Sequence, residues 1–196
     1  MNRSLATALM VPVAAVSLSG CGVNSIPTAE EEAKARWADI QADLQRRNDL
    51  IPNLVETVRG AAAHERGVLR EVTEARASAA QIQLTGDQLT DPAAMARFAE
   101  AQNRLTISLQ RLQEAYPEVR ALENYTVLQD QLEGTENRIA RGREKYNAAV
   151  QAYNTEVRTF PSVIAAKVIY GAKPMVPWQA APEAQRAPKV DFGNQQ

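Results

Sequence analysis

Few residues in this chain have the chemistry of a catalytic or metal site. The sequence contains one histidine and one cysteine. His64 and Glu65 begin like the zinc-protease motif HExxH, but Val68 stands where the second histidine ligand is required. His64 remains a candidate general base oriented by a nearby carboxylate, which predicts a hydrolase. The alternative is that Glu65 pairs with a cation from another helix, Arg138 or Arg143, and that His64 has no catalytic role.

The single cysteine, Cys21, follows a segment with the layout of a secretory signal. Residues 1–20 contain one charge, an apolar run and then small residues. The run Leu18-Ser19-Gly20-Cys21 resembles the lipobox of bacterial lipoproteins. That resemblance implies cleavage before Cys21 and acylation of its thiol. The alternatives are an uncleaved anchor and an ordinary signal with an accidental cysteine. We expect a signal peptide over residues 1–20 and a tether over residues 21–29.

The membrane that holds such an anchor is indicated only by the residue after the cysteine. Gly22 stands where many Gram-negative lipoproteins carry an aspartate as an inner-membrane retention signal. We therefore expect the periplasmic face of the envelope, with the outer membrane favoured over the inner. Stable anchoring needs more than one acyl chain, because a single chain binds reversibly.

Other polar residues are spaced so that they share helix faces. Tyr146-Asn147 and Tyr153-Asn154 repeat after seven residues, which places both pairs on one side of a helix. We interpret these tyrosines as core residues whose hydroxyls find partners, rather than as a ligand site. The expected polar layer in the core comprises Glu65, Glu136, Asn137, Arg138, Tyr146, Asn147, Tyr153 and Asn154.

Three apolar stripes at alternating spacings of three and four residues predict the elements that position these side chains. The first runs from Trp37 to Ile82, within a helix that begins after Thr28 as its cap. The second, from Met95 to Tyr116, begins after an Asp91 cap with Pro92 in the first turn, and Pro117 ends it. The third, from Tyr125 to Tyr153, is followed by a short apolar helix over residues 161–170.

We therefore predict an all-α fold, an up-and-down four-helix bundle of long antiparallel helices with a short last helix. The bundle covers residues 30–170. Residues 171–196 contain four prolines in a polar and alanine-rich context, and we expect a disordered, extended tail. Trp178 and Phe192 are the large anchors of that tail.

Pro52 lies inside the first stripe and allows two structures. Either the helix continues through Pro52 with a kink, or two helices meet at Asp49, and Asn48 or Asp49 would then cap the second one. Both structures gather polar side chains near the bend at a place where packing does not need them. We interpret Arg46, Arg47, Asp49 and Asn53 as a docking site for a partner helix.

The charge balance excludes some classes of function. The chain has 22 basic and 23 acidic residues, a net charge of -1, which argues against nucleic-acid binding. No Ser/His/Asp set, glycine-rich phosphate loop or cysteine pair is present, so no cofactor, metal or small-molecule substrate is predicted.

Several short segments together resemble the LemA family over about residues 36–170. They are Gln45-Arg46-Arg47, residues 49–58 (DLIPNLVETV), His64-Glu65, Ala75-Arg76, residues 114–118 (EAYPE), Glu136-Asn137-Arg138-Ile139, Tyr146-Asn147, Tyr153-Asn154 and Phe160-Pro161. The resemblance implies long antiparallel helices and attachment to a membrane, usually by an N-terminal spanning helix. Because of the lipobox, we expect a lipid anchor in place of that helix here.

These observations predict a lipid-anchored, non-enzymatic protein of the bacterial cell envelope. It would attach to the membrane through acylated Cys21 and act as a scaffold for other envelope proteins or in membrane organisation. Its expected partners are other envelope proteins or further copies of itself. The alternative function is an envelope hydrolase that uses His64 with a nearby carboxylate.

Overall fold

The computed structural model describes residues 24–61 and 67–179, and this part of the chain is helical except for its connections and one extended segment. The predicted all-α fold is confirmed. In the described residues four long helices are present: α2 Ser25–Ala61, α3 Gly67–Gln81, α4 Pro92–Ala115 and α5 Glu123–Arg158. Short helical segments complete the chain: η1 Gly86–Thr90, η2 Pro117–Ala121, α6 Ser162–Ala165 and the π-helical η3 Ala166–Tyr170.

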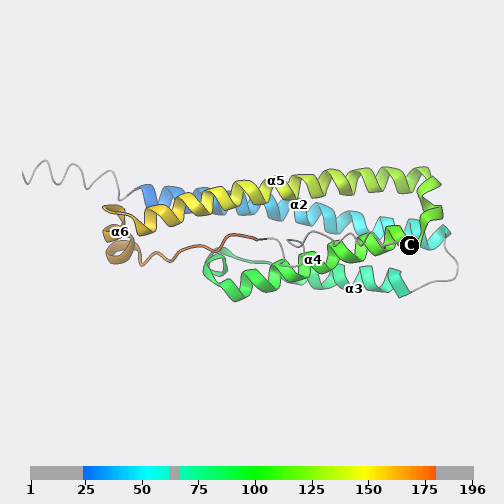
Figure 1. The fold of residues 1–196 in the computed structure, drawn as a ribbon, viewed down its shortest axis with the longest axis horizontal. Helices are drawn as coiled ribbons and strands as arrows, with labels where there is room; N and C mark the ends of the chain where they lie inside the picture. The colour runs from blue at the N-terminus through cyan, green and yellow to red at the C-terminus, as the bar shows by residue number, and fades with distance from the viewer. Residues whose placement is uncertain (1–23, 62–66, 180–196) are drawn as a thin grey trace, which may run out of the picture.

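The long helices run alternately up and down (Figure 1). α2 and α5 have 37 and 36 residues, so each is about 55 Å long at 1.5 Å per residue, and they pack side by side. Gly142 allows their close approach, because a Cβ at this position would lie 3.0 Å from Cγ1 of Ile40. The shorter α3 and α4 form the other pair, and Figure 1 shows both ending short of the α6 end of the molecule.

The expected single helix through Ile82 is corrected. α2 ends at Ala61, and α3 begins at Gly67 and runs back in the opposite direction (Figure 1). The two helices share one apolar cluster, in which Val58 lies on α2 and Val72 on α3. A reversal of this kind preserves the helical spacing of apolar residues, so the stripe does not reveal it. Glycines 60 and 67 at its two ends are the sequence signal, since glycine is a poor residue in a helix interior.

The start of α2 also differs from the expectation. The helix begins at Ser25, within the expected tether over residues 21–29, because Ile26 is fully buried and so belongs to the core. Thr28 lies inside the helix and donates its hydroxyl to the carbonyl oxygen of Asn24 at 2.8 Å, so it is not the cap. The bundle therefore starts before residue 30.

α2 continues through Pro52 without ending, which decides between the two structures considered for this segment. Asp49 does not cap a new helix. Its carboxylate instead accepts from Nε2 of Gln45 at 2.8 Å. The predicted start of α4 is confirmed, because Asp91 accepts from the amide of Ala93 and Pro92 occupies the first turn.

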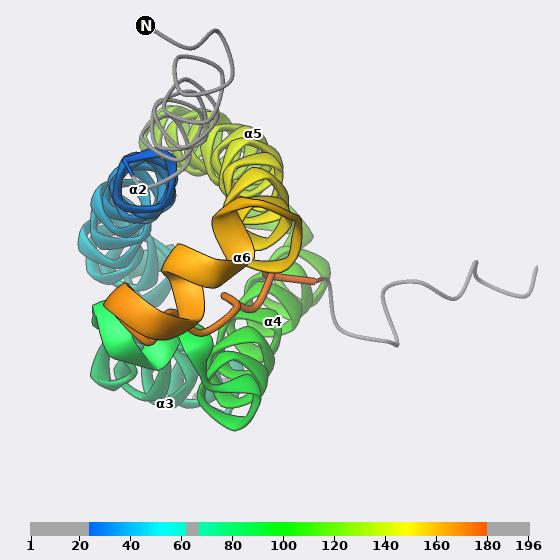
Figure 2. The same ribbon diagram turned by 90° about the vertical axis from the view of Figure 1, so that its left-hand side faces the viewer.

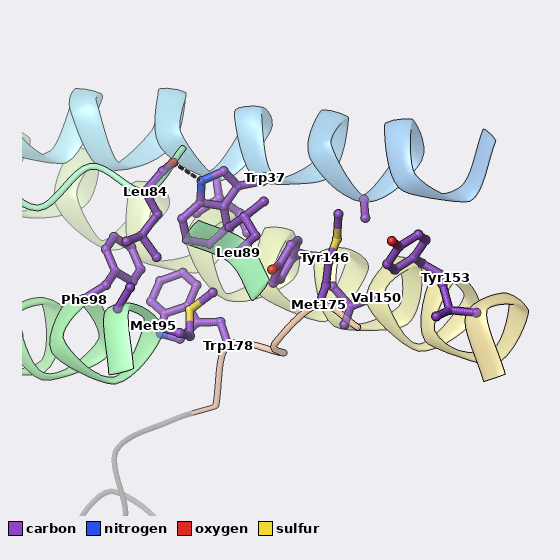
Figure 3. Packing of buried hydrophobic residues seen from close by; sticks show 14 of the residues in the cluster. Trp37, Leu84, Leu89, Met95, Phe98, Tyr146, Val150, Tyr153, Met175 and Trp178 are labelled. Atoms are coloured by element: carbon purple, nitrogen blue, oxygen red, sulfur yellow. Dashed lines mark hydrogen bonds between the residues drawn. The ribbon is translucent and has the colours of Figure 1, made fainter. Parts of the chain in front are cut away.

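The core consists of two apolar clusters along the length of the bundle. The cluster nearer α6 contains Trp37, Phe98, Tyr146 and Trp178, which Figure 3 shows converging from different segments. The other lies toward the opposite end and includes Ile51, Leu105 and Leu132, together with residues such as Leu69, Val72 and Leu112. Polar side chains of α2, α4 and α5 lie between the two clusters.

The expected disorder of the proline-rich tail is corrected for residues 171–179. After Gly171, whose φ of 56° lies in the left-handed region, this segment runs back along the bundle in an extended conformation. Met175 and Trp178 are buried in the first cluster, and the amide of Val176 donates to the carbonyl oxygen of Leu89 at 2.8 Å. The segment fills the space that α3 and α4 leave uncovered. Phe192 lies outside the described residues.

Candidate functional site

A buried arginine joins the helices between the two apolar clusters. Arg47 of α2 is only 2% exposed. Its Nη1 donates to Oε1 of Glu136 in α5 at 2.8 Å, and its Nη2 donates to Oε1 of Gln102 in α4. Gln102 in turn donates to the carbonyl oxygen of Ala79 in α3 at 3.5 Å. One polar layer therefore connects every long helix of the described chain.

This layer restricts how the helices can slide along one another. A buried charge that loses its partner costs about 3–5 kcal/mol, whereas the paired charge adds little net stability. A shift of α4 or α5 by one turn would move Gln102 or Glu136 away from Arg47. The arrangement thus selects one alignment of the helices.

A second ion pair supports the same alignment at the surface of the layer. Nε of Arg138 lies 2.9 Å from Oδ1 of Asp43, and Nη2 of Arg138 donates to the hydroxyl of Thr135 at 2.8 Å. Asn137, by contrast, faces solvent. Of the expected polar layer, the structure therefore brings Glu136 and Arg138 to α2 and leaves Asn137 on the surface.

The two tyrosine–asparagine pairs of α5 lie elsewhere and bind the extended segment that follows Gly171. The Asn154 side chain accepts from the amide of Met175 and donates to its carbonyl oxygen, both at 2.8 Å. Asn147 makes the same pair of bonds to the backbone of Trp178, at 2.8 and 3.0 Å. Tyr146 donates to the carbonyl oxygen of Val176 at 3.0 Å, and Tyr153 donates to that of Lys173 at 3.1 Å. We call residues 172–178, held in this way, the strap.

The seven-residue repeat on α5 matches the geometry of the strap. Seven residues of helix advance about 10.5 Å, and three residues of extended chain advance about 10 Å. The asparagines accordingly bind backbone positions three residues apart, 175 and 178, and the tyrosines bind 173 and 176. Because the bonds go to the backbone, the repeat recognises an extended conformation rather than particular strap side chains.

Burial keeps the phenols of the strap site in the form that donates these bonds. Desolvation raises the pKa of Tyr146 well above the usual value. The pKa of Tyr153 is also raised, first by desolvation and then by the charge of Glu30, with Lys34 acting in the opposite direction. Both hydroxyls therefore stay protonated at neutral pH.

Trp178 is the hydrophobic anchor of the strap. Its ring lies edge-on to Phe98 at 5.1 Å and to Trp37 at 6.2 Å between centroids. The guanidinium of Arg143 lies over the same ring, 5.8 Å from its centroid, within the range of a cation–π interaction. Figure 3 shows Trp37 also fixed by its indole N–H, which donates to the carbonyl oxygen of Leu84 at 3.0 Å.

The predicted docking residues are separated by the fold. Arg47 points into the core, while Arg46, Asp49 and Asn53 are exposed on the outer face of α2. Cys21, His64 and Glu65 lie outside the described residues. The ion pair expected for Glu65 and the catalytic site expected at His64 therefore stay predictions. Arg143, one of the cations considered for Glu65, contacts Trp178.

Sequence reasoning missed Gln102 and Asn48 as polar residues of the core, and it named Trp178 only as an anchor of an extended, disordered tail. Gln102 interrupts the apolar stripe of α4, which is the signal that could have identified it. Asn48 is buried with an unpartnered Oδ1, and it lines a cleft of about 230 Å³ between α2 and α3. The sequence did not show where Trp178 packs, because its partners lie far away in the sequence.

The described residues contain little that resembles a catalytic centre. Residues 24–61 and 67–179 hold no group of three or more His, Cys, Asp or Glu side chains placed to share a metal ion. Over the same ranges, none of the helices combines the length and apolar character needed to cross a bilayer. Among the buried polar side chains there, Arg47 and Gln102 bind other helices, whereas Oδ1 of Asn48 and the hydroxyl of Tyr125 have no hydrogen-bond partner.

Comparison with known proteins gives one family. The model of the LemA family matches residues 36–192. Magnetosome protein MamQ 2 of Paramagnetospirillum magneticum is 26% identical over an alignment of 161 residues, and the match covers 70% of this chain and 58% of that protein. Magnetosome protein MamQ of Magnetospirillum gryphiswaldense is 27% identical over an alignment of 176 residues, and the match covers 80% of this chain and 65% of that protein. This chain spans less than two thirds of the length of these relatives. Since the family model covers most of the chain, the protein belongs to the LemA family.

Proposed function

We propose that this protein is a lipid-anchored, non-enzymatic scaffold of the bacterial cell envelope, which acts by binding other envelope proteins or in membrane organisation. One observation carries the proposal. The polar side chains of the buried layer and of the strap site hold the fold together, as in the bonds from Arg47 to Glu136 and from Asn154 to the backbone of Met175. Such groups are not free to act on a substrate.

Attachment to the membrane is supported by the N-terminal sequence. Leu18-Ser19-Gly20-Cys21 follows an apolar run, and acylation of Cys21 would place more than one lipid chain at the start of the mature protein. We assign the protein to the periplasmic face of a membrane, with the outer membrane favoured by Gly22. The similar MamQ proteins are named as magnetosome proteins, a name that assigns them no reaction.

The outer face of α2 near Pro52 is the proposed partner site. Arg46, Asp49 and Asn53 are exposed there, and the ion pairs of the polar layer do not use them. A proline inside the helix removes one backbone hydrogen bond, and the carbonyl oxygen that loses it, that of Asn48, accepts instead from Nε of Arg76 in α3 at 2.7 Å, so the exposed side chains alone form the proposed site. Arg47 is excluded from the docking site because it is buried.

Site-specific photocrosslinking in cells tests this proposal. A photoreactive amino acid at Asn53 should capture a defined envelope protein or a second copy of the chain. The same residue at Arg97, which is exposed on α4, serves as the matched control. Equal crosslinking from both positions, or none from Asn53 in a protein with unchanged melting, would contradict the docking site.

The variant His64→Ala distinguishes the scaffold proposal from the hydrolase alternative. The scaffold proposal predicts that this variant retains its crosslinks and its cellular phenotype, with at most a change in stability. Loss of the phenotype in a variant that folds, melts and crosslinks normally would favour catalysis by His64.

A further inference from the structure

The α6 end of the bundle exposes a group of large apolar side chains. In the described part of the chain, five of the eight exposed large hydrophobic residues fall between residues 160 and 170, each between 41% and 80% exposed. They are Phe160, Ile164, Val168, Ile169 and Tyr170. We call this group the end cap. Monomeric proteins rarely expose such a concentration of apolar surface unless it binds something.

The end cap lies at the end of the molecule where the anchor would be attached. Figure 2 shows α6 lying across the end of the bundle beside the start of α2. The hydroxyl of Ser25 donates to Oε2 of Glu156 at 2.8 Å, which joins the first turn of α2 to the last turns of α5. Cys21 precedes Asn24 by three residues, so even a fully extended chain keeps it within about 11 Å of this end.

The charges at this end suit an anionic surface. Arg158, Lys167 and Lys173 are exposed, and the sequence contains no Asp or Glu between Arg158 and Gln179. The nearby acids of α2 are already paired with cations. Lys34 lies 2.7 Å from Glu30 and 3.1 Å from Glu31, and Arg36 lies 2.7 Å from Glu32. The end cap therefore combines apolar and aromatic side chains with unpaired lysines, the composition of a segment that lies in a membrane interface.

We propose that the end cap docks into the interfacial layer of the bilayer that holds the lipid anchor, so that the bundle projects away from the membrane. This inference rests on the proposed lipid anchor, because the short connection between Cys21 and α2 would hold α6 close to the bilayer. The apolar side chains enter the boundary between headgroups and acyl chains. Lys167 and Lys173 extend to the anionic headgroups.

If the bundle docks by its α6 end, the two ends of α5 should lie at different distances from the bilayer. Val168 of the end cap would lie in the bilayer. Val127, at the other end of α5, would lie far from it, because the 31 residues from Val127 to Arg158 span about 47 Å of helix. Both valines are exposed, at 79% and 49%, so either can be replaced without disturbing the core.

Val168→Cys and Val127→Cys in the full chain provide matched positions for an environment-sensitive fluorophore. The labelled proteins are reconstituted in vesicles of phosphatidylcholine and phosphatidylglycerol that contain lipids with brominated acyl chains. The label at position 168 should shift to the blue and lose most of its emission to the bromines, and the label at 127 should do neither. Quenching at both positions would mean that the bundle lies flat. An unquenched label at position 168 would mean that the end cap stays in solvent or is covered by a second copy of the chain. Either result overturns the proposal.

The parent chain reports separately on the anchor. Its only cysteine is Cys21, so an acylated parent should take up no label. If the fluorophore does label the parent, Cys21 is not acylated, which would contradict the lipid anchor. Positions 168 and 127 can then still be compared in proteins that carry Cys21→Ser, where position 21 takes up no fluorophore. As a second test, Lys167→Glu with Lys173→Glu should reduce quenching at position 168 in anionic vesicles. Unchanged quenching in these vesicles would contradict the role of the lysines.

Discussion

Asn147 binds the backbone of Trp178 through both atoms of its carboxamide, accepting from the amide at 2.8 Å and donating to the carbonyl oxygen at 3.0 Å. Asn154 does the same for Met175. These bonds satisfy backbone groups that would otherwise lie unpaired against the bundle. The strap is therefore part of the fold, although its composition is that of a loop.

Replacement of Asn147 or Asn154 by alanine should weaken the strap. Each change leaves an amide and a carbonyl group without a partner, which costs about 1–3 kcal/mol. Urea unfolding measures the loss, and limited proteolysis after residue 171 should become faster. Asn137→Ala, on the exposed face of the same helix, should change neither. An unchanged rate of proteolysis in both asparagine variants would contradict the role of the seven-residue repeat.

Trp178→Ala should be among the most destabilising single changes. It removes the ring that Phe98 and Trp37 contact and leaves a cavity, at a cost of about 3–5 kcal/mol. Thermal and urea melts test this. Ile169→Ala, which shortens a side chain that is 61% exposed, should stay within about 0.5 kcal/mol of the parent.

Arg47→Ala should destabilise the bundle by about 2–5 kcal/mol, because it leaves a cavity between the helices and removes the donor to the buried Gln102, whereas Glu136, whose side chain is 38% exposed, can be solvated. Arg47→Met combined with Gln102→Leu should recover much of this loss, since the layer then becomes apolar. The double variant should also lose the preference for one helix alignment, seen as broadened NMR resonances. Arg46→Ala is the control and should be nearly neutral. A double variant that is no more stable than Arg47→Ala would argue against this account of the layer.

Alkaline pH should release the strap. The pKa values of Tyr146 and Tyr153 are raised in the folded state, so their contribution to stability is fully present below the usual tyrosine pKa of 10.0. It is lost as pH rises above 10 toward the folded values, because the phenolate cannot donate to a carbonyl. The free energy of unfolding should be insensitive to these groups from pH 7 to about 9 and then fall by at most about 1.4 kcal/mol per pH unit for each group. A double Tyr→Phe variant at positions 146 and 153 should show a shallower fall.

Cys21→Ser should release the protein from the membrane or leave it unprocessed. Incorporation of a fatty-acid probe should be lost at the same time, because the thiol is the proposed acylation site. Cell fractionation and probe labelling measure the two effects. The end cap could also hold the protein on the membrane, so the fractionation uses Cys21→Ser combined with Val168→Ser and Ile169→Ser. A cleaved protein with these changes that stays in the membrane fraction would contradict the lipid anchor.

The sequence by itself determined the helical class and several boundaries. The apolar stripes of α4 and α5, the Asp91 cap with Pro92 and the break at Pro117 all depend on interactions within a few residues, such as the first-turn hydrogen bond to Asp91. Such local preferences are legible in a single chain. The sequence also singled out Arg47, Tyr146 and Asn147 as unusual polar residues on or beside apolar stripes.

Only the tertiary structure decided what those residues contact. The reversal between Ala61 and Gly67 was not predicted, because a second helix can continue the same apolar spacing in the opposite direction. Arg47 meets Gln102 and Glu136 across 55 and 89 residues of sequence, and Asn147 meets Trp178 across 31. These partners depend on the relative lengths of the helices. Because α3 and α4 leave part of α2 and α5 uncovered, the lowest free energy is reached when the strap buries Trp178 in that space and Asn147 satisfies its backbone.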